Sequence, residues 1–359
     1  MKENKARVIA FYLPQYHPIP ENDKYWGKGF TEWTNVAKAK PLFRGHYQPH
    51  IPADLGFYDL RLPEVREAQA ELARDAGIEG FCYYHYWFGN GKMLLQKPFE
   101  EVLRLGKPDF PFCLCWANHD WTTKTWVKGS SMVNNTMIAQ QEYLGEQDDI
   151  KHFEYCLRAF KDHRYITIEG KPIFLIYDPL SFPNVKEFMN RWNFLAKKNN
   201  LKGIYFIGVT TGRQSSYKIV TNLGFDGVCH NRRWEAEAKA AGFRFVRRMQ
   251  SLLGWHLGIS LMKYDYNKVV RNYDTPENKL ENCYPVITPG FDRTPRAGRR
   301  AGIYVNSSPK NFKKHVAEVC KSIQDKDDDH RLVFLSAWNE WGAVSYTHLR
   351  AHETLRHLV

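Results

Sequence analysis

Two patterns of apolar and polar residues alternate along this chain. Short apolar runs predict buried strands, at 8–13, 80–86, 112–117, 173–177, 203–209, 227–230, 286–290 and 333–337. Longer stretches with apolar residues every three or four positions predict amphipathic helices, at 63–76, 98–105, 148–161, 185–198, 216–223, 240–253 and 310–324. The pattern therefore predicts eight strands separated by seven helices.

This alternation predicts the fold class. Strands separated by helices pair in parallel through right-handed crossovers, and eight such units close into an α/β (β/α)8 barrel of the TIM type. The two longer connections, at 14–62 and 118–147, are rich in aromatic and polar residues. We expect them to be ordered loops over one barrel domain that spans residues 1–343.

The C-terminal segment at 344–359 stands where the eighth helix of a barrel belongs. Its sequence resembles translated sequencing adapter, and we interpret it as a non-native tail that replaces a missing helix. Leu349, Leu355 and Leu358 can form a weak helical stripe, so a genuine terminal helix stays open as the alternative.

Composition narrows the class of partner. Aromatic residues make up 15% of the 359 positions, with 11 Trp and 20 Tyr, and such side chains combine a flat apolar face with a polar group, which suits carbohydrate. The net charge of +12 is scattered, without a recognisable nucleic-acid motif. We therefore expect no nucleic acid, and favour an anionic glycan, a phosphorylated carrier or a membrane surface as the partner.

The chain shows no apolar run of the roughly 20 residues that a membrane span needs, and its N-terminus leads into a strand rather than a signal sequence. We expect a cytoplasmic protein, with peripheral contact to the inner membrane surface as a further expectation. The seven cysteines fall in strand-like or helical runs, which favours buried reduced thiols. Their spacing is not that of a zinc site, so neither a metal nor another cofactor is expected.

The last predicted strand runs into Trp338, Asn339, Glu340 and Trp341. Glu340 can exchange a proton or stabilise a developing cation, and Asn339 can hydrogen-bond a hydroxyl group. The two indoles offer the flat faces on which sugar rings stack. Glu340 is therefore the candidate catalytic residue.

Polar and aromatic residues also follow five other strands, at the barrel face where active sites lie. The candidate substrate-binding residues are Tyr12, Gln15, Tyr16, His17, Glu32, Trp33, Tyr84, His85, Trp87, Trp116, Asn118, His119, Trp121, Tyr177, Asp292, Arg293, Arg296, Trp338, Asn339 and Trp341. Each has a structural alternative: Tyr12 in the core, His85 as a satisfied buried imidazole, Arg296 in a salt bridge. Their convergence from six strand ends favours a sugar site.

Several long motifs carry a family resemblance. They are Phe-Tyr-Leu-Pro-Gln-Tyr-His at 11–17, Gly-Phe-Thr-Glu-Trp-Thr-Asn-Val at 29–36, Tyr-Gln-Pro-His-Ile-Pro-Ala-Asp-Leu-Gly at 47–56, Trp-Ala-Asn at 116–118, Thr-Pro-Arg at 294–296 and Trp-Asn-Glu-Trp at 338–341. Together, from about Val8 to Gly342, they resemble the WbsX-type family, also described as glycoside hydrolase family 99-like and found in bacterial O-antigen and capsule gene clusters. The resemblance implies a (β/α)8 barrel that acts on glycans and is related to endo-acting α-mannosidases.

The resemblance also implies a mechanism. The related hydrolases use two carboxylates three residues apart after the eighth strand: the first assists the sugar 2-hydroxyl, and the second acts as acid and then base. The first maps onto Glu340, but position 343 is Ala343, so hydrolysis by this chain is expected to be undetectable. Glu32 is the only other acid in a family motif that could swing in, and we treat it as a substrate ligand. His119 and Phe291 also depart from the family pattern, at positions that bear on sugar specificity.

The leading interpretation is a carbohydrate-active enzyme of O-antigen or capsule (lipopolysaccharide and surface polysaccharide) biosynthesis, which cleaves or transfers a glycosyl unit. The first alternative is a glycosyltransferase with a nucleotide- or lipid-linked donor, whose phosphate Arg293 and Arg296 would bind. The second is a catalytically silent glycan-binding barrel. The sequence leaves the sugar, its linkage and the oligomeric state open.

Overall fold

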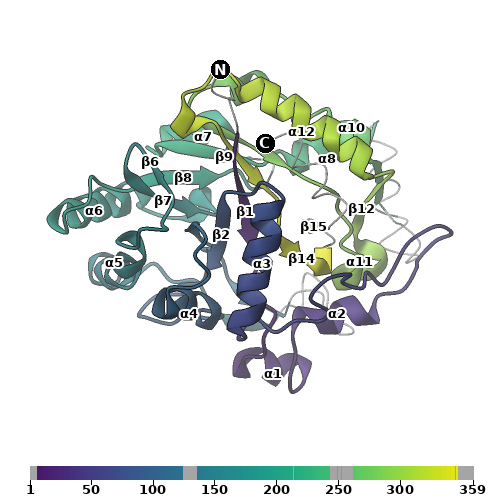
Figure 1. Ribbon diagram of the computed structural model, residues 1–359, viewed down its shortest axis with the longest axis horizontal. Helices are drawn as coiled ribbons and strands as arrows, with labels where there is room; N and C mark the ends of the chain where they lie inside the picture. Colours follow the sequence, from purple (N-terminus) through teal and green to yellow (C-terminus); the bar gives the residue numbers. More distant parts are fainter. Residues whose placement is uncertain are drawn as a thin grey trace.

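Eight parallel strands form a closed ring in the computed structural model, which describes residues 6–123, 136–212, 214–242, 249, 252, 262–343, 345 and 346. In chain order they are β1 (Arg7–Tyr12), β2 (Gly80–His85), β3 (Phe112–Trp116), β7 (Lys171–Ile176), β8 (Tyr205–Val209), β9 (Gly227–His230), β11 (Cys283–Ile287) and β13 (Leu332–Leu335). Each strand pairs with the next, and β13 pairs back onto β1, with Val8 opposite Val333. The predicted (β/α)8 barrel is confirmed (Figure 1).

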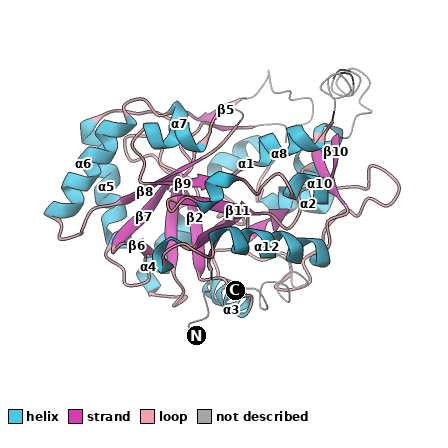
Figure 2. Ribbon diagram, turned by 90° about the horizontal axis from the view of Figure 1, so that it is seen from above, coloured by secondary structure: helices cyan, strands magenta, loops and turns pink. Residues whose placement is uncertain are grey.

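Helices connect successive strands and surround them (Figure 2). The connecting helices are α3 (Pro63–Asp75), α4 (Lys97–Leu105), α5 (Glu146–Phe160), α6 (Val185–Lys198), α7 (Tyr217–Asn222), α8 (Arg233–Ala240), α10 (Tyr266–Val270) and α12 (Pro309–Ile323). Local sequence explains their starts: before α12, the Ser308 side chain accepts a hydrogen bond from the Asn311 amide, and Pro309 occupies the first turn. Their apolar faces then pack on the strands, as in α12, where Phe312, Val316 and Val319 are buried.

Shorter elements decorate the barrel. They are α1 (Pro20–Trp26), α2 (Glu32–Lys38), α11 (Thr294–Ala297), β4 (Trp121–Thr122), β5 (Met137–Ala139), β6 (Thr167–Ile168), β10 (Met262–Asp265), β12 (Gly302–Val305), β14 (Asn339–Glu340), β15 (Ser345–Tyr346), and the 3-10 turns η1 (Pro179–Ser181), η2 (Pro276–Lys279), η3 (Gly298–Arg300), η4 (Asp328–His330) and η5 (Trp341–Ala343). The loop expected at 14–62 is ordered and contains α1 and α2.

The structure differs from the sequence prediction at strand β11 and leaves two predicted segments largely undescribed. Strand β11 begins at Cys283, three residues before the predicted start at 286, and it includes Pro285, which sits opposite His230. The helix expected at 240–253 lies largely outside the described residues. Helix α8 ends at Ala240, where this predicted helix begins. The segment at 344–359 also lies outside them except for residues 345 and 346, so its interpretation as a non-native tail stays a prediction.

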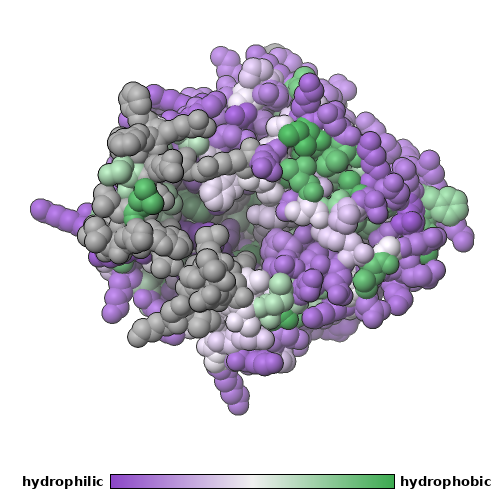
Figure 3. Space-filling model, turned by 180° about the vertical axis from the view of Figure 1, so that it is seen from behind, coloured by the Kyte–Doolittle hydropathy of each residue, from purple (hydrophilic) through white to green (hydrophobic). Residues whose placement is uncertain are grey.

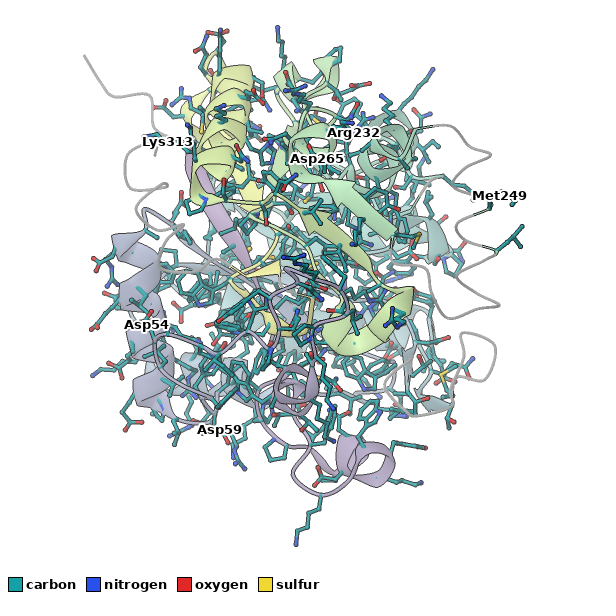
Figure 4. All side chains as sticks on the ribbon, turned by 90° about the vertical axis from the view of Figure 1, so that its right-hand side faces the viewer. Asp54, Asp59, Arg232, Met249, Asp265 and Lys313 are labelled. Carbon is teal, nitrogen blue, oxygen red and sulfur yellow. The ribbon has the colours of Figure 1, made fainter. Side chains whose placement is uncertain are left out.

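Charged side chains are spread around the molecule. In Figure 4, Lys313 and Arg232 lie in the upper half and Asp54 and Asp59 in the lower half. Figure 3 shows that hydrophilic side chains predominate over the described surface on the face opposite to Figure 1, with hydrophobic ones in separate patches. Among the described residues, no helix is long and apolar enough to cross a bilayer.

Buried histidines make acid stability a testable property of this fold. His315 is 1% exposed, its Nε2 has no hydrogen-bond partner among the described residues, and burial lowers its pKa to about 3. Because the unfolded chain binds a proton at about pH 6.5, the free energy of unfolding should fall as the pH drops below 6.5, by up to about 1.4 kcal/mol per pH unit for this one group.

Urea unfolding between pH 7 and pH 4 tests this expectation. A His315→Leu variant should show a shallower loss of stability with acid than the parent chain, because one proton fewer is taken up on unfolding. The exposed His163 provides the control, since His163→Leu should leave the slope unchanged. Equal slopes for the parent and His315→Leu would contradict the assignment.

Candidate active site

A cavity of about 240 Å³ opens at the carboxyl ends of the barrel strands. All eight strands or the loops after them contribute to its lining: Phe11, Leu13, Gln15, Tyr84, Tyr86, Ala117, His119, Trp121, Tyr177, Val209, Thr210, Thr211, Asn231, Arg233, Trp234, Thr288, Phe291, Arg293, Arg296, Ser336, Glu340 and Ala343, joined by Tyr273 and Tyr304. The cavity therefore lies where a barrel of this type places its chemistry.

The strand end that carries Glu340 is fixed by its neighbours. Asn339 accepts a hydrogen bond from the Leu13 amide at 2.7 Å and donates one to the Leu13 carbonyl at 3.0 Å. The Trp341 amide donates to the Tyr16 hydroxyl oxygen at 3.0 Å. With the residues on both sides held against the loop after β1, the Glu340 side chain stays 26% exposed in the cavity.

Arg296 joins Glu340 to a second, deeper carboxylate. Its Nη1 donates to Oε1 of Glu340 at 2.6 Å, and its Nε donates to Oε2 of Glu32 at 3.1 Å. The Glu32 side chain is fully buried and does not line the cavity. Burial alone would lower the pKa of Arg296, but the two carboxylates raise it well above its ordinary value, so a permanent positive charge stands beside Glu340.

Asp292 supports the two segments that carry Arg296 and Glu340. Its Oδ2 accepts hydrogen bonds from Nε2 of Gln48 and lies 2.7 Å from Nε2 of His46, while Oδ1 accepts from the Thr294 amide at 2.8 Å. The Asp292 amide donates to the carbonyl of Ala343 at 2.9 Å. Asp292 thus links the start of α11, which carries Arg296, to the loop of His46 and Gln48 through its carboxylate, and to the turn that follows Glu340 through its backbone amide.

Aromatic hydroxyl groups face the same space. Tyr84 and Tyr177 line the cavity from β2 and from the end of β7, with ring centroids 6.0 Å apart. Burial raises the pKa of both phenols, so they stay protonated and can donate hydrogen bonds to sugar hydroxyl groups. Thr288 and Ser336, which hydrogen-bond each other, add two more hydroxyls to the lining.

The predicted site residues divide into two groups. Those that line the cavity are Gln15, Tyr84, His119, Trp121, Tyr177, Arg293, Arg296 and Glu340, together with Ala343. Those that do not line it are Tyr12, Tyr16, His17, Glu32, Trp33, His85, Trp87, Trp116, Asn118, Asp292, Trp338, Asn339 and Trp341. All members of the second group are buried, and they support the cavity from the core or from the loops around it.

Around the Trp-Asn-Glu-Trp motif, the indoles pack in the core rather than face the cavity. Trp341 donates from Nε1 to the Tyr58 hydroxyl at 3.1 Å, and Trp33 donates to the Tyr58 carbonyl at 2.8 Å. Trp338 packs on Phe81 with ring centroids 5.4 Å apart. Neither Trp338 nor Trp341 lines the cavity, so their expected stacking on sugar stays a prediction. For Trp341, the alternation of side-chain direction along the chain turns the indole away from the side that Glu340 faces.

The residues expected after β1 also have internal partners. Tyr12 is fully buried and its hydroxyl donates to Gln69. His17 lies in a separate groove with Arg61 and Lys97, where burial lowers its pKa to about 4. Neither residue lines the cavity that contains Glu340.

The residues expected after β2 and β3 are engaged with α5 and with each other. Trp87 donates to Asp148 on α5, and Trp116 donates from Nε1 to the Trp87 carbonyl at 2.9 Å. Asn118 donates to the Asp178 carbonyl and accepts from the Asp178 amide, so it ties the end of β3 to the end of β7. Of the indoles in this part of the chain, that of Trp121 lines the cavity and that of Trp116 does not.

His85 belongs to a buried cluster of side chains of the types that bind metal ions. It lies with His152 and Cys156 so that one ligand atom of each is within 4.8 Å of the others. The two Nε2 atoms are 2.8 Å apart, a direct hydrogen bond between the imidazoles, and burial lowers both pKa values, that of His85 to about 3. This geometry describes a neutral histidine pair that joins β2 to α5, outside the cavity.

Trp116 provides a test of the core assignment. Trp116→Ala should lower the free energy of unfolding by about 3–5 kcal/mol, because it removes a buried indole and a hydrogen bond to Trp87. Chemical unfolding followed by near-ultraviolet dichroism measures this loss. The exposed aromatic Phe194 gives a matched control, since Phe194→Ala should change stability by less than about 1 kcal/mol. A fully stable Trp116→Ala protein with weakened glycan binding would return Trp116 to the site.

Several lining residues escaped the sequence reasoning. They are Thr210 and Thr211 after β8, Asn231, Arg233 and Trp234 after β9, and Tyr273 and Tyr304. The rule applied to the other strand ends would have found those after β8 and β9, since both strands were predicted. Tyr273 and Tyr304 lie between β9 and β13 in segments that do not directly follow a barrel strand. The rule therefore does not predict them.

Comparison with known proteins agrees with this architecture. A family profile described as "Glycosyltransferase WbsX" matches residues 8–352. WxcX of Xanthomonas campestris pv. campestris, in strains B100 and ATCC 33913, is 34% identical over 342 residues, which is 94% of this chain and 47% of the relative. The chain thus spans about half the length of the curated relatives it matches.

Solved structures show the same fold at low identity. The GH99 endo-α-mannosidase of Bacteroides thetaiotaomicron, in complex with Bis-Tris-propane, aligns with a TM-score of 0.56 at 14% identity, over 96% of this chain and 87% of that one. A glycoside hydrolase-like protein aligns with a TM-score of 0.58 at 14% identity, over 99% and 93% of the two chains. From the profile match and the 34% identity, the chain belongs to the WbsX glycosyltransferase family.

Proposed function

We propose that this chain is a carbohydrate-active domain of bacterial surface-polysaccharide biosynthesis, which binds a glycan in the cavity and cleaves or transfers a glycosyl unit at Glu340. The observation that carries the proposal is the position of Glu340. It is a carboxylate held by a permanent cation, partly exposed in a cavity at the carboxyl ends of the strands. Phenol and hydroxyl groups that can hydrogen-bond sugar hydroxyls surround it.

The family supports the substrate class. Its description is that of a glycosyltransferase, and the named structural neighbour with the same barrel is an endo-α-mannosidase. We therefore propose endo-mannosidase-like chemistry, in which Glu340 serves the sugar 2-hydroxyl as the first carboxylate of a pair. Glu32 is too deep for the role of second acid, because it is fully buried beneath Arg296.

Ala343 occupies the place where the second carboxylate of such a pair is expected. It lines the cavity, three residues after Glu340, and its methyl group cannot transfer a proton. One carboxylate cannot act both on the 2-hydroxyl and on the glycosidic oxygen. We therefore propose that cleavage needs a carboxylate at position 343, and that the chain with Ala343 retains glycan binding or transfer but not hydrolysis.

A second candidate is a glycosyltransferase with a nucleotide- or lipid-linked donor. The observation in its favour is that Arg233, Arg293 and Arg296 all line the cavity, where guanidinium groups can bind phosphate. A transferase that needs only one carboxylate would also tolerate Ala343.

Labelled glycans separate these proposals. We would incubate the protein with fluorescent α-mannose-containing oligosaccharides and lipid-linked oligosaccharides, with and without an acceptor sugar. Label released into water indicates hydrolysis, label on the acceptor indicates transfer, and affinity without turnover indicates a binding barrel. Absence of both binding and turnover across these glycans would contradict the proposed function.

A further inference from the structure

Two arginines in the cavity have no acceptor for their guanidinium groups. Arg233 and Arg293 both line the cavity, and no hydrogen bond from either side chain to another described residue exists. The nearest carboxylate to Arg233 is that of Glu237, with Nε and Oε1 3.8 Å apart, beyond hydrogen-bond distance. Arg293 has no carboxylate oxygen within 4.0 Å among the described residues. Arg296, by contrast, binds Glu32 and Glu340.

The two guanidinium groups lie in an electropositive part of the cavity. Burial lowers the pKa of Arg293, and the positive charges of Arg296 and Arg233 lower it further. Glu237, 3.8 Å from Nε of Arg233, compensates part of the charge of Arg233, whereas the net effect of burial and of the neighbouring arginines is to disfavour the charge of Arg293. Partly buried like charges whose N–H groups lack hydrogen-bond acceptors are costly. An anion in the cavity would remove this cost.

Contacts within the protein hold the Arg233 side chain and the Arg293 backbone. The Arg233 guanidinium lies over the rings of Trp234 and Phe291, at 4.6 and 4.7 Å from their centroids. Arg293 immediately precedes α11, and its amide donates to the Gly302 carbonyl at 3.3 Å. Since the cation–π contacts restrict the Arg233 guanidinium group, its donors are organised before any ligand arrives, and Arg293 extends from a backbone position that is hydrogen-bonded.

We propose that Arg233 and Arg293 form a subsite for an oxyanion, a carboxylate or a phosphate, carried by the sugar that binds beside Glu340. Arginine pairs bind both groups through parallel N–H donors. Arg296, on the same turn as Arg293, holds Glu340, so the oxyanion would sit next to the reacting sugar ring. The identity of the carrier as a sugar rests on the proposed function, while the oxyanion subsite itself does not.

Calorimetric titration with three related sugars tests the proposal. Glucose, glucuronate and glucose 1-phosphate share a ring and differ in the anion, and at low ionic strength at least one anionic sugar should bind 10-fold or more tightly than glucose. Tighter binding of glucuronate assigns the subsite to an acidic sugar residue of the glycan. Tighter binding of the phosphate assigns it to an activated or lipid-linked donor. Equal affinity for all three sugars would overturn the subsite.

Matched variants localise the effect. Arg293→Gln and Arg233→Gln should each reduce the preference for the anionic sugar about 10-fold, and Arg293→Lys should retain part of it. Arg299→Gln, at an exposed position on the neighbouring turn η3, should leave it unchanged. Near-ultraviolet dichroism of each variant checks the fold. A folded Arg293→Gln and Arg233→Gln pair that both keep the full preference would also overturn the proposal.

Failure of the proposed function would look different. The titrations are repeated with Glu340→Gln, in which the preference for the anionic sugar should persist because Arg233 and Arg293 are unchanged. An intact preference for the anionic sugar in an Ala343→Glu protein that neither hydrolyses nor transfers any glycan contradicts the enzymatic proposal and leaves the subsite standing. Turnover of glycans without any anion preference contradicts the subsite alone.

Discussion

Replacement of Glu340 by glutamine is expected to abolish glycosyl turnover, by 10³-fold or more, while glycan affinity stays within a few-fold. The amide retains the shape of the side chain and an oxygen that can accept the hydrogen bond from Nη1 of Arg296. It loses the negative charge and the proton chemistry, which act in the transition state more than in the bound ground state. Turnover should therefore fall without a matching change in binding.

The experiment needs an active background, since Ala343 is expected to prevent hydrolysis in the present chain. We would introduce Glu340→Gln beside a Glu at position 343, and measure turnover with labelled glycan and affinity by calorimetry. Glu318→Gln, on the exposed face of α12, controls for a general effect of replacing a carboxylate. Comparable turnover with and without Glu340→Gln would exclude Glu340 as the reacting carboxylate.

The second large effect is a gain. Ala343→Glu is expected to raise glycoside hydrolysis about 10²–10⁴-fold, the usual contribution of a positioned general acid or base. Ala343 already lines the cavity on η5, the turn that directly follows Glu340, and its carbonyl is held by the Asp292 amide, so a carboxylate there would enter the site on a fixed backbone.

Ala343→Gln is the matched control, because it adds the same bulk without a group that titrates near neutral pH. Release of reducing ends from α-mannose-containing oligosaccharides measures the rate for both variants. Equal, undetectable hydrolysis by folded Ala343→Glu and Ala343→Gln proteins would contradict the two-carboxylate mechanism. It would favour transfer or binding, which the acceptor assay distinguishes.

The sequence predicted the frame of the protein because the frame depends on local patterns. Each barrel strand is a run in which nearly every residue is buried, as in Phe112–Trp116, and each helix shows an apolar stripe. The hydrophobic periodicity of the sequence therefore predicts both the strands and the helices directly. The predicted strand at 286–290 begins three residues later than the observed β11. The ends of β11 are set by its pairing with β9 and β13, which are distant in the sequence and so do not contribute to the local pattern.

The sequence also located the site at the ends of the strands, since the barrel topology alone brings those ends together. It could not decide which side chains enter the cavity. Glu340 points inward while Trp341 packs against Trp33 and Tyr58, although the two residues are adjacent. That choice depends on side-chain direction and on partners far away in the chain.

Hydrophobic patterning and short-range motifs therefore suffice to predict the barrel, the strand order and the position of Glu340 after the last strand. The burial of Glu32 beneath Arg296, the support of the site by Asp292 through His46 and Gln48, and the presence of Arg233 and Arg293 in one cavity follow only from the three-dimensional fold. These are contacts between segments up to 264 residues apart, and their charges and hydrogen bonds find partners only once the chain has closed the ring.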